Sequence, residues 1–286
     1  MSAENSTPQQ AELERLDKLT KKSGDISITL ILNSLSAASS WEVKWHALKA
    51  VKRCGVVNEL VVNQLVEALD GIHRVPSGKQ TYYERALDGA LVQAGALISP
   101  HIDAIITRAL ENPDDSNLDD DADEEFERIL TTASASRSAL ASVAKHITKE
   151  QADRCFDSLR SAATAGERAA AVEVCTTALK RFASPHLDAI VAASRDEDEI
   201  VRATAADALE RCAGLSFDYK RGAGYGVAQT RAEHQLITSR LLEMRTDSSK
   251  VVRENVSGAL SILGYKEDGG ADGVDRSPAK RTRLSQ

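Results

Sequence analysis

A helix-length pattern occurs three times in this chain: SSWEVKWHALKAVKRCG near the start, DEDEIVRATAADALERCAG late, and SSKVVRENVSGALSILG near residue 260. Each copy begins with small polar or acidic residues, has a basic residue after a valine, and then places apolar residues at helical spacing before a glycine. Aligned on the basic residue, Lys44, Arg202 and Arg253 coincide. Because one helix pair cannot bury its apolar face alone, the repeat predicts an array of stacked helix pairs.

A second repeat is independent of the first. The sequence SPHIDAI begins at Ser99 and SPHLDAI begins at Ser184, 85 residues later. That distance fits two units of roughly 40 to 47 residues. In both copies the serine is predicted to cap a helix and the proline to fit its first turn.

These patterns resemble the HEAT-repeat family, in which two antiparallel helices form each unit and the second helix carries a V-R-x-x-A-x-x-A-L-x-x-L-G-like pattern. The residues that carry the match are Val201, Arg202, Ala205, Ala208 and Leu209, then Val252, Arg253, Ala259, Leu260, Leu263 and Gly264. The match covers about residues 26–264, with arginine positions that align poorly between residues 81 and 183. It implies an all-α fold, a right-handed α-solenoid of about five to six HEAT-like pairs. Such arrays serve as scaffolds, transport receptors, chromatin-complex subunits and assembly chaperones, and a few bind DNA or catalyse reactions.

Composition agrees with a helical array. Aromatic residues make up 4% of the chain and there are only six prolines, which suits helices filled by alanine, leucine, valine and isoleucine. No segment has the roughly 18 unbroken apolar residues of a membrane span, and the first residues do not read as a signal peptide, so we expect a soluble intracellular protein. The four dispersed cysteines are predicted to be small core side chains and not zinc ligands or disulfides: Cys54, Cys155, Cys175 and Cys212.

The predicted organisation has three parts. Residues 1–22 form a polar tail with a possible short helix, residues 23–264 form the solenoid, and residues 265–286 form a disordered tail. The solenoid contains an acidic insertion at 111–127 and a loop rich in aromatic residues and glycine at 213–229. Its predicted helices span 26–38, 41–54, 58–71, 80–96, 100–111, 123–134, 136–147, 149–164, 167–183, 185–195, 198–213, 231–245 and 248–264.

The last residues, RSPAKRTRLSQ, contain a short basic cluster. Lys280, Arg281 and Arg283 resemble a monopartite nuclear localisation signal, which an import receptor would bind; the alternative is a solubilising basic end. Ser277 lies in a Ser-Pro-Ala-Lys sequence, the form of a cyclin-dependent-kinase site. A phosphate of about −2 charge there would weaken receptor binding. The hypothesis is that phosphorylation of Ser277 regulates nuclear entry.

Two internal segments have an unusual composition. The acidic insertion lacks the central glycine of a calcium-binding loop, so it is interpreted as a docking strip for a basic partner or as a solvated insertion. The second segment interleaves aromatic and basic side chains, which can stack bases and contact phosphates or can pack on the neighbouring repeat. Its residues of interest are Phe217, Tyr219, Lys220, Arg221 and Tyr225.

No catalytic constellation stands out. The six histidines are scattered, and the sequence lacks the His-Glu pairs of HEAT-like hydroxylases. HEAT-like alkylpurine DNA glycosylases use tryptophan and aspartate beside a basic face, and Trp41, Trp45 and Asp88 are residues of those types. A net charge of −7 argues against phosphate binding. A basic stripe would need Lys44, Lys52, Arg53, Lys180, Arg181, Arg202 and Arg211 on one face.

The sequence therefore predicts a non-enzymatic scaffold or adaptor in the nucleus, without a cofactor or metal. The inner helices of successive repeats would line one concave surface that binds protein partners, through Lys44, Glu84, Arg202 and Arg253 or their neighbours. The alternative is a nucleic-acid-binding HEAT-like protein in DNA repair or chromatin.

Overall fold

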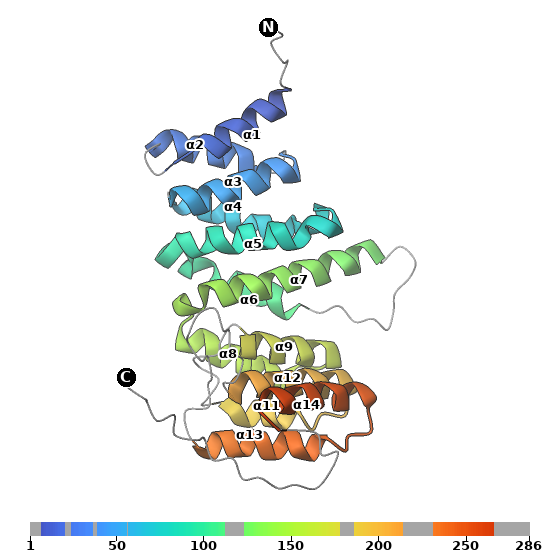
Figure 1. Cartoon of the computed structure of the whole chain (residues 1–286). Helices are drawn as coiled ribbons and strands as arrows, with labels where there is room; N and C mark the ends of the chain where they lie inside the picture. The colour runs from blue at the N-terminus through green and yellow to red at the C-terminus, as the bar shows by residue number, and fades with distance from the viewer. Residues whose placement is uncertain are drawn as a thin grey trace, which may run out of the picture.

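Helices account for all regular secondary structure in the described part of the chain. The computed structural model describes residues 7–20, 24–36, 39–55, 57–111, 123–177, 186–213 and 231–265, and these ranges contain no β-strand. The helices follow one another down an elongated stack, from α1 (Pro8–Lys18) in blue to α13 (Arg231–Met244) and α14 (Lys250–Ile262) in orange and red (Figure 1). The all-α prediction is confirmed.

Consecutive helices pack in pairs. The contacting pairs are α2 (Gly24–Leu35) with α3 (Trp41–Cys54), α4 (Glu59–Asp70) with α5 (Ser77–Ala94), α6 (Ile102–Leu110) with α7 (Asp123–Val143), α8 (Lys149–Ser161) with α9 (Ala165–Thr177), α11 (Leu187–Ala193) with α12 (Glu199–Ala213), and α13 with α14. We call the earlier member of each pair the first helix and the later member the second helix. Each second helix also contacts the next one, from α3 through to α14, so the second helices form a continuous layer.

Short-range signals set the ends of these helices. Helix α3 begins after Ser40, whose hydroxyl accepts a hydrogen bond from the Val43 amide at 3.4 Å, and it ends at Gly55 in the left-handed conformation, with φ of 64°. Helix α8 begins with a capping box, in which Thr148 and Gln151 each accept a hydrogen bond from the backbone amide of the other. These local signals explain why the predicted boundaries are close to the observed ones.

The core runs the length of the stack. Buried side chains from Leu16 in α1 to Leu263 after α14 form one continuous cluster. Residues at equivalent repeat positions have the same burial: Val201 and Val252 are both buried, as are Leu209 and Leu260. All four cysteines are free and buried, as predicted.

Two local predictions are wrong. The predicted helices 123–134 and 136–147 are one helix, α7, because the intervening Ala/Ser/Thr sequence contains no glycine or proline to end it. Ser99 does not cap α6; it lies in the 3₁₀ segment η2 (Gly95–His101) with Pro100, and His101 precedes the α-helix without a side-chain cap. Helix α11 likewise begins after His186, so the two copies remain equivalent, while Ser184 lies outside the described residues.

One helical stretch, Ser77–Leu110, is long and apolar enough to cross a membrane by length and composition. It consists of α5, η2 and α6, and its side chains Leu87, Leu91 and Ile98 are buried. Helix α5 lies between α3 and α7 in the layer of second helices. Packing within the stack buries 39% of the most apolar window of this stretch.

Candidate functional site

Arginines near the start of two second helices join neighbouring pairs. Arg168 of α9 donates from Nε and Nη2 to the two carboxylate oxygens of Asp196, at 2.7 and 2.9 Å. Arg202 of α12 binds Asp247 in the same way, at 2.8 and 3.0 Å. Both aspartates lie in the turn that precedes the second helix of the following pair. We call these two contacts the arginine bridges.

The aspartates of the bridges are held from two sides. Asp196 accepts the Asp198 amide at 2.9 Å, and Asp247 accepts the Ser249 amide at 2.9 Å. The hydrogen bonds from Arg202 lower the pKa of Asp247. Burial alone would raise the pKa of Asp196, but hydrogen bonds from Arg168 and the turn amide outweigh burial and lower it. Both carboxylates are therefore ionised at neutral pH and receive bidentate, charge-assisted hydrogen bonds.

The first helices carry their own links. Arg108 of α6 binds both oxygens of Asp70 at the end of α4, at 2.6 and 2.8 Å. Arg240 of α13 donates to the hydroxyl and carbonyl oxygens of Ser194 at the end of α11, at 2.6 and 2.7 Å. Arginines thus connect successive pairs on both layers of the stack.

The predicted partner residues have different environments. Arg202 is 13% exposed and belongs to a bridge, so its charge serves the stack. Lys44 and Glu84 are half-buried on α3 and α5: burial lowers the pKa of Lys44, as does the nearby Arg74 charge, and burial raises the pKa of Glu84. Arg253 is exposed at the last pair. These four residues lie on four different helices, and only Arg202 and Arg253 share a contact, Asp247. Their role in partner binding stays a prediction.

Asp88 on α5 has a hydroxyl partner on the neighbouring second helix. It accepts a hydrogen bond from the Ser138 hydroxyl of α7 at 2.7 Å. Burial raises the pKa of Asp88 to about 6, the Ser138 hydrogen bond opposes this shift, and the Glu84 charge adds to it. This pair lies between two neighbouring second helices, and the sequence indicated Asp88 only by analogy with a glycosylase.

The outward-facing positions of the last second helices, which are partly or fully exposed, form what we call the second-helix strip. On α12 it comprises Ile200, Thr204, Asp207 and Arg211; on α14 the equivalent residues are Val251, Asn255, Gly258 and Ile262; on α9 it includes Glu173. Contacts between α9 and α12 and between α12 and α14 place these rows side by side. Three of its apolar side chains are more than half exposed: Ile200 at 63%, Val251 at 51% and Ile262 at 51%.

A shallow polar hollow lies within this strip. It has a volume of about 230 Å³ between α9 and α12 and is lined by Glu173, Thr176, Thr204, Asp207, Ala208 and Arg211. Arg137 of α7 lies at its edge, with Nε 2.9 Å from Glu173 Oε2. Burial raises the pKa of Asp207, and the Arg211 charge opposes the shift. The lining of the hollow carries both charges, while the hydroxyls of Thr176 and Thr204 donate to the backbone carbonyls of Val172 and Ile200.

The basic residues that a nucleic-acid stripe requires are partly used elsewhere. Arg53 donates to the carbonyls of Leu16 and Leu19, at 2.6 and 2.9 Å, and holds α1 against α3. Arg202 is in a bridge, and Lys180 and Arg181 lie outside the described residues. Lys49 lies over the Trp45 ring, 4.3 Å from its centroid. The described cations therefore serve several different contacts.

Two histidines of the described chain make contacts between helices. His186 stacks on Phe156 with ring centroids 4.2 Å apart and lies 2.9 Å from Asp153, and His46 lies 2.9 Å from Asp17. Within the described ranges, no group of three or more histidine, cysteine, aspartate or glutamate residues could hold a metal ion.

Several predicted sites fall on residues that the structure does not describe. These are Lys280, Arg281, Arg283 and Ser277 in the tail, the acidic residues from 112 to 122, and the aromatic residues from 214 to 229. Their proposed roles stay predictions. Sequence reasoning also missed Arg168, although its Glu-Arg-Ala-Ala setting resembles the other second helices.

No protein-family model matches this sequence, and no curated protein is similar to it. The resemblance to HEAT repeats therefore depends on the residues and helix pairs described above.

Proposed function

We propose that this chain is a non-enzymatic, right-handed α-solenoid of about five to six HEAT-like helix pairs, and that it binds protein partners along its second helices. The main support is a contrast between α12 and α14. Their buried positions are alike, with Val201 equivalent to Val252 and Leu209 to Leu260, and their outward-facing positions differ. The repeated residues maintain the stack, and the variable outward-facing residues would recognise a partner.

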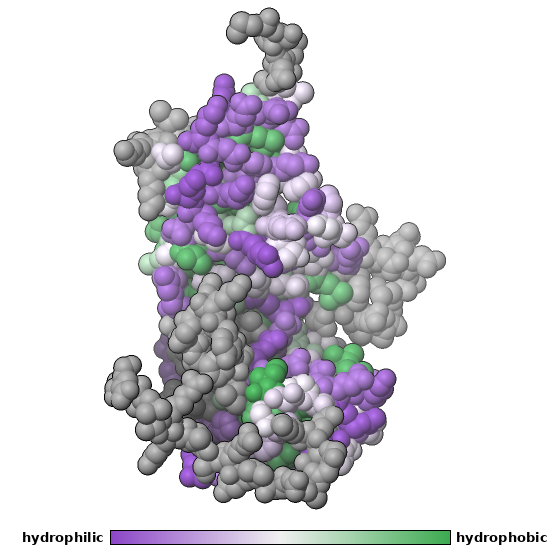
Figure 2. All heavy atoms as spheres, in the orientation of Figure 1, coloured by the Kyte–Doolittle hydropathy of each residue, from purple (hydrophilic) through white to green (hydrophobic). Residues whose placement is uncertain are grey.

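The outward-facing positions change chemistry from one helix to the next. Asp207 on α12 is equivalent to Gly258 on α14, and Arg211 is equivalent to Ile262. A partner that lies across both helices would meet charged, polar and apolar groups in a fixed order. Figure 2 shows, on the face drawn, a mainly polar surface with small separate apolar patches. Affinity would then come from several modest contacts along the strip, with specificity set by its charges.

Affinity capture of the full-length chain from nuclear extract tests this function. The extract is treated with nuclease or left untreated, and Ile200→Glu is compared with wild type. The matched control is Leu60→Glu, because Leu60 is 59% exposed on the first helix α4. We expect one polypeptide to be retained in stoichiometric amount after nuclease treatment, at least tenfold less by Ile200→Glu and equally by Leu60→Glu.

Two results would contradict the proposal. Retention that disappears with nuclease would favour the alternative function, nucleic-acid binding. Retention that Ile200→Glu and Leu60→Glu reduce equally would exclude the second-helix strip as the binding surface.

A nuclear location is the second part of the proposal, supported by the basic cluster at Lys280, Arg281 and Arg283. A fluorescent fusion in which these three residues are changed to alanine should lose nuclear accumulation. For regulation by phosphorylation, Ser277→Asp should enter the nucleus less than Ser277→Ala. Equal distribution of these two variants across the cell cycle would contradict a regulatory role for Ser277.

A further inference from the structure

The last helix pair contains an arginine, Arg253, that is held by the backbone in the same way as the two bridging arginines. In each of three second helices the equivalent arginine donates from Nη1 to a carbonyl of the segment before its own helix. Arg168 donates to Ala163 at 3.2 Å, Arg202 to Asp196 at 2.9 Å, and Arg253 to Asp247 at 2.6 Å. Arg253 also reaches the Ser248 carbonyl at 2.8 Å. The three guanidinium groups are therefore fixed in the same way.

Arg253 differs from the two bridging arginines in its contact with a carboxylate. Arg168 and Arg202 use Nε and Nη2 to bind an aspartate of the following pair. Within the ranges that the structure describes, no pair follows α14 and no carboxylate is bonded to Nε or Nη2 of Arg253. Arg253 is exposed, in contrast to the 13% exposure of the Arg202 side chain. Its carboxylate-binding edge is positioned and open.

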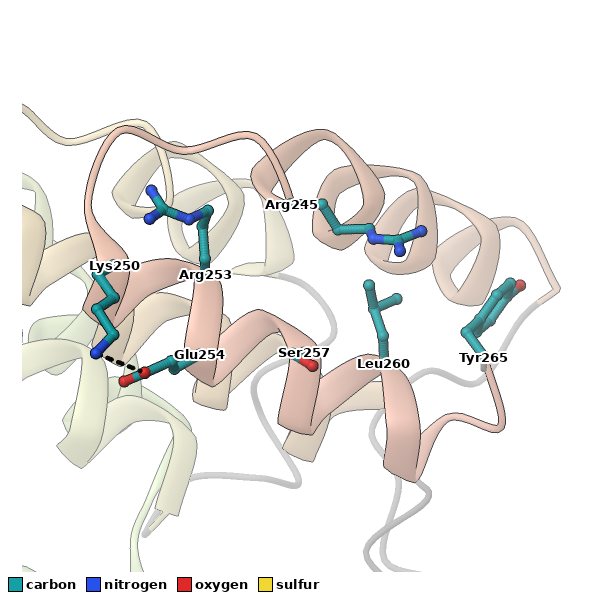
Figure 3. A pocket seen from close by; sticks show the side chains of 7 residues that line it. All are labelled: Arg245, Lys250, Arg253, Glu254, Ser257, Leu260 and Tyr265. Atoms are coloured by element: carbon teal, nitrogen blue, oxygen red, sulfur yellow. Dashed lines mark ion pairs between the residues drawn. The ribbon is translucent and has the colours of Figure 1, made fainter. Parts of the chain in front are cut away.

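A groove of about 370 Å³ surrounds this position. Figure 3 shows the side chains that line it: Arg245, Lys250, Arg253, Glu254, Ser257, Leu260 and Tyr265. Three of them are cationic and one is anionic, and that carboxylate already lies 3.5 Å from the Lys250 ammonium group. In a chain of net charge −7, this groove is locally positive. The Tyr265 ring, which is 43% exposed, gives it an apolar side.

We infer that this groove, the end groove, binds an acidic peptide segment of another protein, with an aspartate seated on Arg253. The two complete bridges within the chain indicate the ligand chemistry. At both of them the bound aspartate lies in a turn and accepts the amide two residues later, which aims its carboxylate at the arginine. A partner with an aspartate in such a turn, followed by acidic and then apolar residues, would complement Arg253 and Arg245, and then the exposed Tyr265 ring.

The end groove shares helix α14 with the second-helix strip but is lined by other residues of that helix, and it also includes Arg245 and Tyr265. Failure of a peptide to bind here would leave partner binding along the strip untouched. Likewise, failure of the affinity capture would leave peptide binding in the end groove untouched. The proposed function and the end groove are therefore tested by different measurements.

The test uses a peptide copied from a complete bridge, residues 194–201 of this chain, SRDEDEIV, with blocked ends and a fluorescent label. Its binding to the full-length protein is followed by fluorescence anisotropy. The matched control peptide carries Asp196→Asn, which keeps the shape and removes the bridging charge. We expect the control peptide to bind at least tenfold more weakly, because it cannot form the bidentate ion pair.

Three protein variants distinguish bidentate recognition from general attraction. Arg253→Lys keeps the positive charge without the planar fork, and it should weaken binding at least fivefold. Arg245→Gln removes a groove cation that has no role in holding the turn, and it should weaken binding about threefold. Arg15→Gln removes an exposed cation from α1 at the opposite end of the stack and should have no effect. Circular dichroism of each variant verifies folding.

Three results would overturn the inference. One is equal binding of the aspartate and asparagine peptides. Another is equal binding to wild type and Arg253→Lys. The third is binding that occurs only after residues 266–286 are removed, because the chain's own acidic residues, Glu267, Asp268, Asp272 and Asp275, would then be the occupant.

Discussion

Arg202 and Arg253 occupy the same position in their repeats and make the same Nη1 contacts, yet their surroundings differ. Arg202 is 13% exposed and bound to Asp247 of the next pair, and Arg253 is exposed at the end of the described stack. In the sequence, each of the two arginines follows a valine directly and an aspartate six residues earlier. The role of such an arginine is therefore decided by whether another helix pair stacks against it. Inside the array it joins helix pairs, and at the end it is available to a ligand.

The largest change in the free energy of unfolding is expected when an arginine bridge inside the stack is broken. Arg202→Ala leaves the partly buried Asp247 carboxylate without two charged hydrogen bonds, and it should lower the free energy of unfolding by about 2–3 kcal/mol. Urea denaturation followed by circular dichroism measures this change. A loss of less than about 0.5 kcal/mol would show that the bridge does not hold the two pairs together.

Asp247→Asn should have a smaller effect, about 1–2 kcal/mol at pH 7, because the side chain keeps its size and one acceptor oxygen. Arg202 lowers the folded-state pKa of Asp247, so the stability from this group is present above the unfolded pKa of about 3.9 and is lost as pH falls through the folded value. The difference between wild type and variant should therefore shrink in denaturation measurements below about pH 3. A constant difference across that range would contradict an ionic bridge.

The pH dependence of stability should have the opposite sign at Asp88, which does not belong to an arginine bridge. Burial raises the pKa of Asp88 to about 6, so its contribution to stability is fully present at low pH and is lost as pH rises through about 6. Asp88→Asn should raise the free energy of unfolding by about 1–2 kcal/mol at pH 8 and give no gain at about pH 4. Parallel denaturation curves at the two pH values test this; a loss of stability at both would contradict it.

The smallest change in the free energy of unfolding is expected for Arg253, at the end of the described stack. Arg253→Gln should change the free energy of unfolding by less than about 1 kcal/mol, because it loses hydrogen bonds to two exposed carbonyls and no carboxylate. The measurement is the same urea titration as for Arg202→Ala. A loss as large as that of Arg202→Ala would mean that Arg253 has a structural partner and is not open.

Much of the fold can be predicted from the sequence because local signals and repeat register agree. Helix periodicity and end signals such as Ser40 and Gly55 place the helices within a few residues. The prediction divides the single helix α7 wrongly because an Ala/Ser/Thr sequence carries no periodic stripe. The predicted cap at Ser99 depends on composition alone, and the backbone around Pro100 takes a 3₁₀ turn.

The candidate site is less predictable for a physical reason. An arginine bridge depends on which turn lies opposite the guanidinium group, and Arg168 reaches Asp196 across 28 residues whereas Arg202 reaches Asp247 across 45. Chain spacing therefore does not reveal the partner. The sequence could indicate that Arg202 and Arg253 are equivalent, but only the stacking of α12 between α9 and α14 shows that one is occupied and the other is open.

The most direct test of the open position at Arg253 is a side-chain ¹⁵N–¹H spectrum of the arginine Nε groups in the full-length protein, assigned with single arginine variants. We expect slow exchange with water for Arg168 and Arg202, whose Nε groups donate to carboxylates, and fast exchange for Arg253. Adding the SRDEDEIV peptide should then slow the exchange of Arg253 alone. Equal protection of all three arginines without peptide, or no response of Arg253 to it, would contradict the open bridge position.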